Sequence, residues 1–143
     1  MPTLNTAPTL NRAYSLLHWK STDDEQRLLE GMATTPTPDR LADVIEPEGV
    51  QFKLPLPLLY QHNSRQPIGH VLTAKVSPDG ITVKAQLAPA GIAPFIDEAW
   101  ALIKSGLIRG LSIGFRSIEQ SFNRDTGGFH FLKTEWIELS AVT

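Results

Sequence analysis

Residues 68–87 have the sequence IGHVLTAKVSPDGITVKAQL, and this stretch predicts a β-hairpin. Apolar and polar residues alternate through residues 81–87, as they do on a strand that buries one face. The turn is expected at residues 77–80, because Pro-Asp-Gly combines a fixed proline φ with a glycine that accepts positive φ. The hairpin therefore predicts an antiparallel sheet as the framework of the fold.

Six further segments have the composition of short strands or extended chain. They are residues 12–20, 27–33, 43–46, 52–61, 111–120 and 129–141. Segment 52–61 contains Pro55 and Pro57, which cannot donate to a ladder, so we expect it at the edge of a sheet. The 11 prolines and 10 glycines are scattered along the chain, which suits short strands better than long helices.

One segment, residues 94–104, predicts a helix that ends at Gly106. Its apolar residues form one face at spacings of three and four: Ile96, Ala99, Trp100 and Ile103. In total we expect about six to eight strands and one or two helices. The predicted fold class is therefore mainly β (α+β), a single antiparallel β-barrel with the helices packed outside, because closure removes exposed sheet edges.

The composition favours one soluble domain in a chain of 143 residues, with 41% hydrophobic residues and a net charge of -2. The absence of cysteine excludes disulfides, thiolate catalysis and cysteine-bound zinc, and fits a reducing compartment. Residues 1–11 are polar and rich in Pro and Thr, which predicts a flexible N-terminal arm before a domain at residues 12–143. Neither a basic excess nor a long apolar run is present, so we expect no nucleic-acid or membrane partner.

Ser112 is a candidate nucleophile in the segment Leu-Ser-Ile-Gly-Phe at residues 111–115. Strand alternation puts Leu111, Ile113 and Phe115 on a core face, and Ser112 and Gly114 on the other. A glycine on the same face leaves space over the serine, where a substrate backbone could approach. The alternative is a solvent-facing serine of a strand.

His62 is a candidate general base because it stands where an apolar stretch becomes polar. A partly desolvated histidine can stay neutral and accept a proton. The alternative is a surface or capping histidine, and the other three histidines compete for the role: His18, His70 and His130.

Glu138 lies inside the apolar segment 136–140, where a buried carboxylate would need a partner such as a histidine. An outward-facing glutamate on an amphipathic strand fits the pattern equally well. Along an unbroken strand, His130 and Glu138 would share one face at a separation of roughly 27 Å, so only one of them could reach His62.

Other motifs point to no chemistry. Residues 110–114 match the letters of the Gly-x-Ser-x-Gly motif of esterases, but that motif requires a strand–turn–helix, and here it lies within a predicted strand. No phosphate-binding or dinucleotide-binding glycine motif occurs, and the four histidines lack metal-ligand spacing. We therefore expect no cofactor and no metal.

Three segments, in order and spacing, resemble the caudoviral prohead serine proteases, the capsid-maturation proteases of tailed phages. They are LYQHN followed by PIGHV at residues 59–63 and 67–71, GLIRGLSIGF at 106–115, and ELSAVT at 138–143. The resemblance covers roughly residues 12–143. It implies a protease domain whose fold is similar to that of the herpesvirus assemblins.

The resemblance implies that Ser112 is the nucleophile, His62 its base and Glu138 the third catalytic residue. His130 is the alternative third residue, since assemblin-like sites use a second histidine, and Glu135 is a further one. The implied substrates are phage scaffold protein, major capsid protein and the protease itself. A homodimer, and action inside the assembling prohead in the host bacterial cytoplasm, whether phage- or prophage-encoded, are also implied. The rival interpretations are a non-catalytic β-barrel capsid or scaffold component and an esterase.

Overall fold

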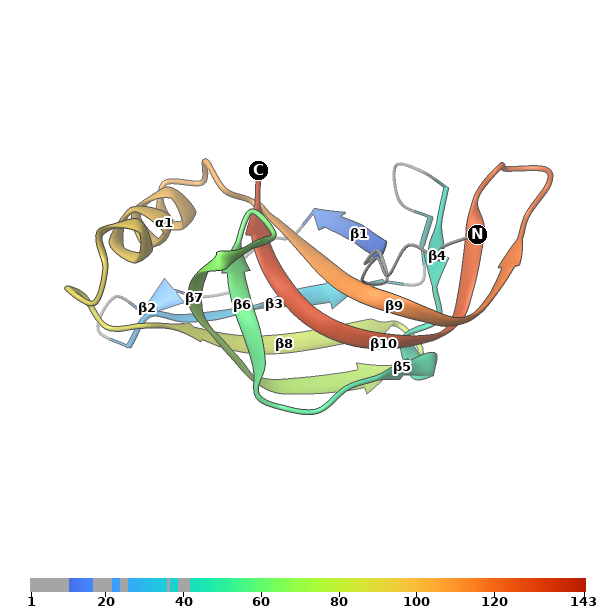
Figure 1. Cartoon of the computed structure of the whole chain (residues 1–143), viewed down its shortest axis with the longest axis horizontal. Coiled ribbons are helices and arrows are strands. Elements are labelled where there is room, and N and C mark those ends of the chain that lie inside the picture. The colour runs from blue at the N-terminus through green and yellow to red at the C-terminus, as the bar shows by residue number, and fades with distance from the viewer. Residues whose placement is uncertain (1–10, 17–21, 24–25, 36, 39–41) are drawn as a thin grey trace, which may run out of the picture.

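The structure, a computed structural model, describes residues 11–16, 22–23, 26–35, 37–38 and 42–143 (Figure 1). The predicted arm at residues 1–11 lies outside the described residues except for Asn11, the first residue of β1. The strand predicted at 12–20 is described only as far as Leu16. His18 also lies outside the described residues.

Ten strands form one sheet in the described part of the chain. They are β1 (Asn11–Leu16), β2 (Thr22–Asp23), β3 (Leu28–Thr34), β4 (Val44–Ile45), β5 (Val50–Gln51), β6 (Leu56–Tyr60), β7 (Asn63–Ser77), β8 (Gly80–Leu87), β9 (Gly110–Phe122) and β10 (Phe129–Val142). Their order is β1-β9-β10-β6-β7-β8-β3-β2, and β4 and β5 pair with β10. Figure 1 shows the sheet curling, with the long strands β9 and β10 bent across it.

The predicted hairpin is confirmed as β7 and β8, which are antiparallel and end in the pair Ser77↔Gly80. β7 is longer than predicted, because it pairs with β6 along its first half and with β8 along its second. Gly69 lies at the change of partner and pairs with both Leu58 and Leu87. A side chain there would collide with the carbonyl of Gln86, so the close approach of the strands requires glycine.

The expectation that segment 52–61 forms an edge strand is wrong. β6 lies inside the sheet, between β10 and β7. Its pairing with β10 begins only at Leu58, so Pro57 is paired on one side, with His70 of β7. The missing N–H of a proline is tolerated where the strand is bonded on a single side.

The mainly β fold class is confirmed, whereas the expectation of a purely antiparallel sheet needs correction. β10 is antiparallel to β9 but parallel to β4, β5 and β6. The outer strands of the sheet order, β1 and β2, share no ladder within the described residues. Hairpin patterns reveal only strands that are neighbours in sequence, so they could not reveal the parallel pairing of β6 with β10.

The predicted helix is confirmed as α1 (Pro94–Lys104), and its four predicted apolar residues are buried. A short 3₁₀-helix, η1 (Pro47–Gly49), is the other helical element described. Arg27 anchors α1 to the chain before β3: its Nη1 lies 2.8 Å from Asp97 Oδ1, and its guanidinium lies 6.0 Å from the ring of Trp100. One apolar cluster joins α1 to both halves of the sheet.

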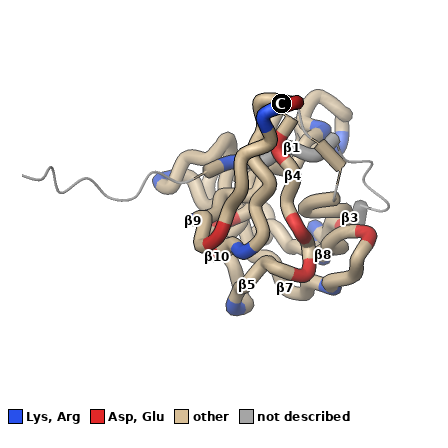
Figure 2. The backbone as a smooth tube through the Cα atoms, turned by 90° about the vertical axis from the view of Figure 1, so that its right-hand side faces the viewer, with Lys and Arg blue, Asp and Glu red and all other residues tan. Residues whose placement is uncertain are grey.

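Figure 2 shows basic and acidic residues mixed along the backbone. The exposed pairs Lys84–Glu30 and Lys133–Glu119 have N···O separations of 3.3 and 3.9 Å. Such pairs contribute at most about 1 kcal/mol each, so the apolar core carries the stability of the fold. No helix among the described residues is long and apolar enough to cross a membrane.

Candidate active site

His62 lies in the two-residue turn between β6 and β7. Gln61 and His62 have φ of 52° and 59°, and Tyr60 pairs with Asn63 across the turn. Positive φ at both central residues is the pattern of a type I′ hairpin turn, which favours Asn and Gly. A non-glycine residue in this region costs about 1–3 kcal/mol, so the surrounding structure must hold the turn. The backbone N–H groups of Gln61 and His62 donate to the Ala141 carbonyl (3.0 Å) and to Ser140 Oγ (3.1 Å) of β10.

Ser112 lies on β9, where it pairs with Tyr14 of β1 on one side and Ser140 of β10 on the other. It is fully buried. The core face predicted for this strand is confirmed, since Leu111, Ile113 and Phe115 belong to the apolar cluster.

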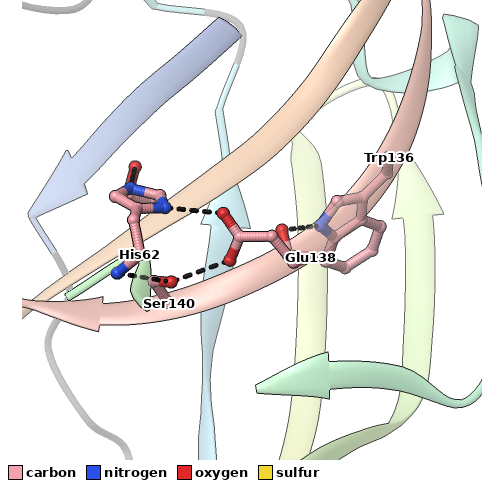
Figure 3. A network of polar contacts seen from close by, with 5 residues as sticks. His62, Trp136, Glu138 and Ser140 are labelled. Carbon is pink, nitrogen blue, oxygen red and sulfur yellow. Dashed lines mark hydrogen bonds and ion pairs between the residues drawn. The ribbon is translucent and has the colours of Figure 1, made fainter. Parts of the chain in front are cut away.

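A β-bulge in β10 determines where Glu138 points. Trp136 pairs with Phe115 of β9, and Glu138 pairs with the next residue back, Gly114, so Ile137 is left without a partner in the ladder. The extra residue turns Trp136 into the core and Glu138 toward the face of Ser112. Trp136 Nε1–H donates to the backbone carbonyl of Glu138 at 2.8 Å and so closes the bulge (Figure 3).

The bulge also corrects the expectation that β10 keeps one face from His130 to Glu138, because the register shifts at several points along this strand. His130 Nε2 lies 2.6 Å from Glu46 Oε1, and Glu135 pairs with Arg116. The structure thus brings Glu138 to His62 and gives these two alternative residues other partners. His70 is exposed on β7.

The space over Gly114 is not open, contrary to the expectation from sequence. The carboxylate of Glu138 fills it, and a Cβ at position 114 would collide with Oε1. The missing side chain at this position therefore makes room for the acid rather than for a substrate.

The three candidate side chains form one line of hydrogen bonds. Ser112 Oγ lies 2.7 Å from His62 Nε2, and His62 Nδ1 lies 2.6 Å from Glu138 Oε1. The side chains of His62 and Glu138 are 6% and 7% exposed. An ionised carboxylate only accepts, so Nδ1 carries the hydrogen and Nε2 is free to accept from the Ser112 hydroxyl. This arrangement of nucleophile, base and orienting acid is suited to acyl transfer.

Two contributing residues were not identified from the sequence. Ser140 Oγ donates to Glu138 Oε2 at 2.7 Å, and Trp136 closes the bulge (Figure 3). Residues two apart on a strand share one face, so the spacing of Glu138 and Ser140 was the sequence feature that could have identified Ser140 as a neighbour of the carboxylate. Among the described residues, no group of three or more His, Cys, Asp or Glu could hold a metal ion.

Comparison with known proteins gives relatives from tailed phages. The chain is 55% identical over 137 residues to the capsid polyprotein of Pseudomonas phage PAJU2, covering 93% of this chain and 20% of that protein. It is 28% identical over 153 residues to the prohead protease of Escherichia phage T5, covering 98% of this chain and 68% of that protein. The chain therefore spans only one fifth of the length of the first of these relatives.

The fold is similar to that of the bacteriophage T4 capsid assembly protease, with a TM-score of 0.72. The alignment covers 96% of this chain and 98% of that chain at 12% identity, so it bears on the fold alone. The family model described as caudovirus prohead serine protease matches residues 19–143, which include β2 to β10 and α1. The chain belongs to the caudovirus prohead serine protease family.

Proposed function

We propose that this chain is a serine endopeptidase domain that processes phage scaffold and capsid proteins during prohead maturation and also cleaves itself. The observation that carries the proposal is the continuous hydrogen-bonded line from Ser112 through His62 to Glu138. Family membership supports peptide-bond hydrolysis, and the names of the two relatives, a prohead protease and a capsid polyprotein, support capsid proteins as substrates.

In the proposed mechanism, His62 Nε2 takes the proton of Ser112 Oγ as this oxygen attacks the peptide carbonyl. The Nδ1–H bond to Glu138 fixes the tautomer that leaves Nε2 free, and the carboxylate stabilises the imidazolium that forms. His62 then gives the proton to the leaving amine, and an acyl group remains on Ser112. Water, deprotonated by His62, attacks this ester, and Ser112 regains its proton as the product acid leaves.

Ser112 has no exposed surface, so a peptide must displace part of the chain to reach its oxygen. β10 is bonded to other strands on both sides, whereas β1 is the outermost strand of the described sheet and pairs there with β9 alone. We therefore place substrate entry on the β1 side of β9, where an extended peptide could add as a strand. Faster reaction of Ser112 with an acylating peptide after removal of residues 1–16 would support this entry side, and an unchanged rate in a folded variant would exclude it.

Several further features belong to the proposal. Residues 12–143 act as the protease domain without a cofactor, the chain forms a homodimer, and it works inside the assembling prohead in the host cytoplasm. Closure of the curled sheet into a barrel similar to that of the herpesvirus assemblins is also proposed. Sedimentation equilibrium tests the dimer, and a cross-link between cysteines introduced into β1 and β2 tests the closure.

The test of the proposed function is cleavage of peptides that span capsid and scaffold processing segments, followed by mass spectrometry. We expect wild-type protein to cut such peptides and Ser112→Ala to leave them intact. Ser117→Ala, on the same strand but outside the site, is the matched control and should keep full activity. No cleavage by folded wild-type protein would favour the non-catalytic capsid component, and turnover of simple esters without peptides would favour the esterase.

The identity of the third residue is tested by comparing Glu138→Gln with His130→Ala. Glutamine keeps the shape of the side chain but no longer enforces the Nδ1–H tautomer, so we expect kcat to fall roughly 10²- to 10⁴-fold. His130→Ala should retain near wild-type kcat, because His130 pairs with Glu46 away from Ser112. The opposite pattern of rates would replace this mechanism with a Ser-His-His site.

Gly114→Ala tests whether the glycine exists to accommodate the acid. The added methyl group would displace the carboxylate of Glu138, the end of a side chain that can move, so the protein should still fold. We expect the unfolding free energy to drop by about 1–3 kcal/mol and kcat to fall as in Glu138→Gln.

The control is Ile113→Val on the core face of the same strand, which should cost about 0.5–1.5 kcal/mol and leave kcat unchanged. Chemical denaturation and steady-state kinetics give both quantities. Wild-type kcat in a folded Gly114→Ala protein would contradict the assigned place of the carboxylate.

A further inference from the structure

Ser140 stands at a junction between the turn that carries His62 and the carboxylate of Glu138. It is fully buried on β10, in register with Ser112 of β9 on one side and Leu59 of β6 on the other. Its hydroxyl donates to Glu138 Oε2 at 2.7 Å and accepts the backbone N–H of His62 at 3.1 Å (Figure 3). Ser140 Oγ is therefore hydrogen bonded both to His62, which contacts Ser112, and to Glu138, which contacts His62.

We propose that Ser140 is a positioning residue that holds Glu138 and His62 in their reactive geometry. The inference rests on the proposed function, because it assigns a role within the same site. The two hydrogen bonds of the Ser140 hydroxyl go to Glu138 and His62 rather than to Ser112. Ser140 acts through the two residues that it orients, so it is a fourth member of the site in a supporting role.

The hydrogen bonds of the Glu138 carboxylate show why the Ser140 hydroxyl matters. Glu138 Oε1 accepts from His62 Nδ1, and Oε2 accepts from Ser140. The two bonds fix the rotation of the carboxylate plane, so Oε1 stays aimed at the imidazole. Without the second bond, a buried oxygen loses its donor and the carboxylate can turn away from His62.

The same hydroxyl supports the backbone of the base. His62 has a φ of 59°, a region that non-glycine residues occupy only when their surroundings hold them there. The bond from its N–H to Ser140 Oγ, together with that from Gln61 N–H to the Ala141 carbonyl, ties the turn to β10. Ser140 thus holds the main chain of His62 directly, and it holds the imidazole through Glu138.

The experiment compares Ser140→Ala with Thr134→Val in the full chain. Thr134 lies on the same strand and is buried, but its hydroxyl has no hydrogen-bond partner among the described residues, so it is a matched control for removing a buried hydroxyl. We expect Ser140→Ala to lower kcat on a cleavable peptide roughly 10- to 100-fold, the loss expected for a hydrogen bond to a charged group, with KM little changed. Thr134→Val should keep the wild-type kcat.

A second readout does not depend on turnover. In Ser112→Ala protein, the proton on His62 Nδ1 should give a low-field NMR resonance, because it is bonded to a buried carboxylate. Adding Ser140→Ala should broaden or shift this resonance, whereas adding Thr134→Val should leave it in place. If the wild-type protein cleaves no peptide but Ser140→Ala still changes this resonance, the proposed function is rejected and the positioning role is kept.

Wild-type kcat together with an unaltered resonance in Ser140→Ala would overturn the inference. If the alanine variant does not fold, Ser140→Cys provides the same test, because it keeps the shape of the side chain and offers only a weak S–H donor. A cysteine variant with wild-type kcat and resonance would also overturn it, and one with reduced kcat at constant KM would support it.

Discussion

The carboxylate of Glu138 is buried over Gly114 on the sheet face that carries Ser112, and a buried charge is tolerated only when it is paired and hydrogen bonded. Each of its oxygens has a partner, His62 Nδ1 for one and Ser140 Oγ for the other. Several local features of the fold serve this arrangement. The bulge in β10 turns the side chain to the correct face, and Gly114 leaves the volume that it occupies. The turn at Gln61 and His62, with positive φ at both residues, brings the His62 ring to the Glu138 carboxylate.

The parallel pairing of β6 with β10 is what joins these features. It sets Leu58, Leu59 and Tyr60 beside residues 139–141, so the turn that follows β6 lies at the C-terminal end of β10. The antiparallel partner of β10 on its other side, β9, carries Ser112. The proposed nucleophile and acid lie on the adjacent strands β9 and β10, and the proposed base lies in the turn that follows β6. Pairing of these three strands fixes the relative positions of the three residues, which suits catalysis that depends on preorganised geometry.

The sequence predicts those parts that depend on neighbouring residues. The hairpin of β7 and β8, helix α1 and the core face of β9 follow from local alternation and turn chemistry. His62 and Glu138 are candidates because each interrupts an apolar stretch, and Ser112 is one because it shares a strand face with Gly114. The segments of all three also resemble those of a family. The interior place of β6, the bulge at Ile137 and the role of Ser140 depend on pairing between strands far apart in sequence, which alternation cannot reveal. The two-residue turn at Gln61 and His62 lacks the Asn or Gly that normally marks positive φ.

In the proposed mechanism, His62 and Glu138 activate Ser112 as a nucleophile. The most direct measurement is reaction with a fluorophosphonate, followed by mass spectrometry to locate the adduct. We expect one modified residue, Ser112, and a strongly reduced rate of modification in His62→Ala. A folded wild-type protein that stays unmodified, or that is modified at another serine, would contradict the account.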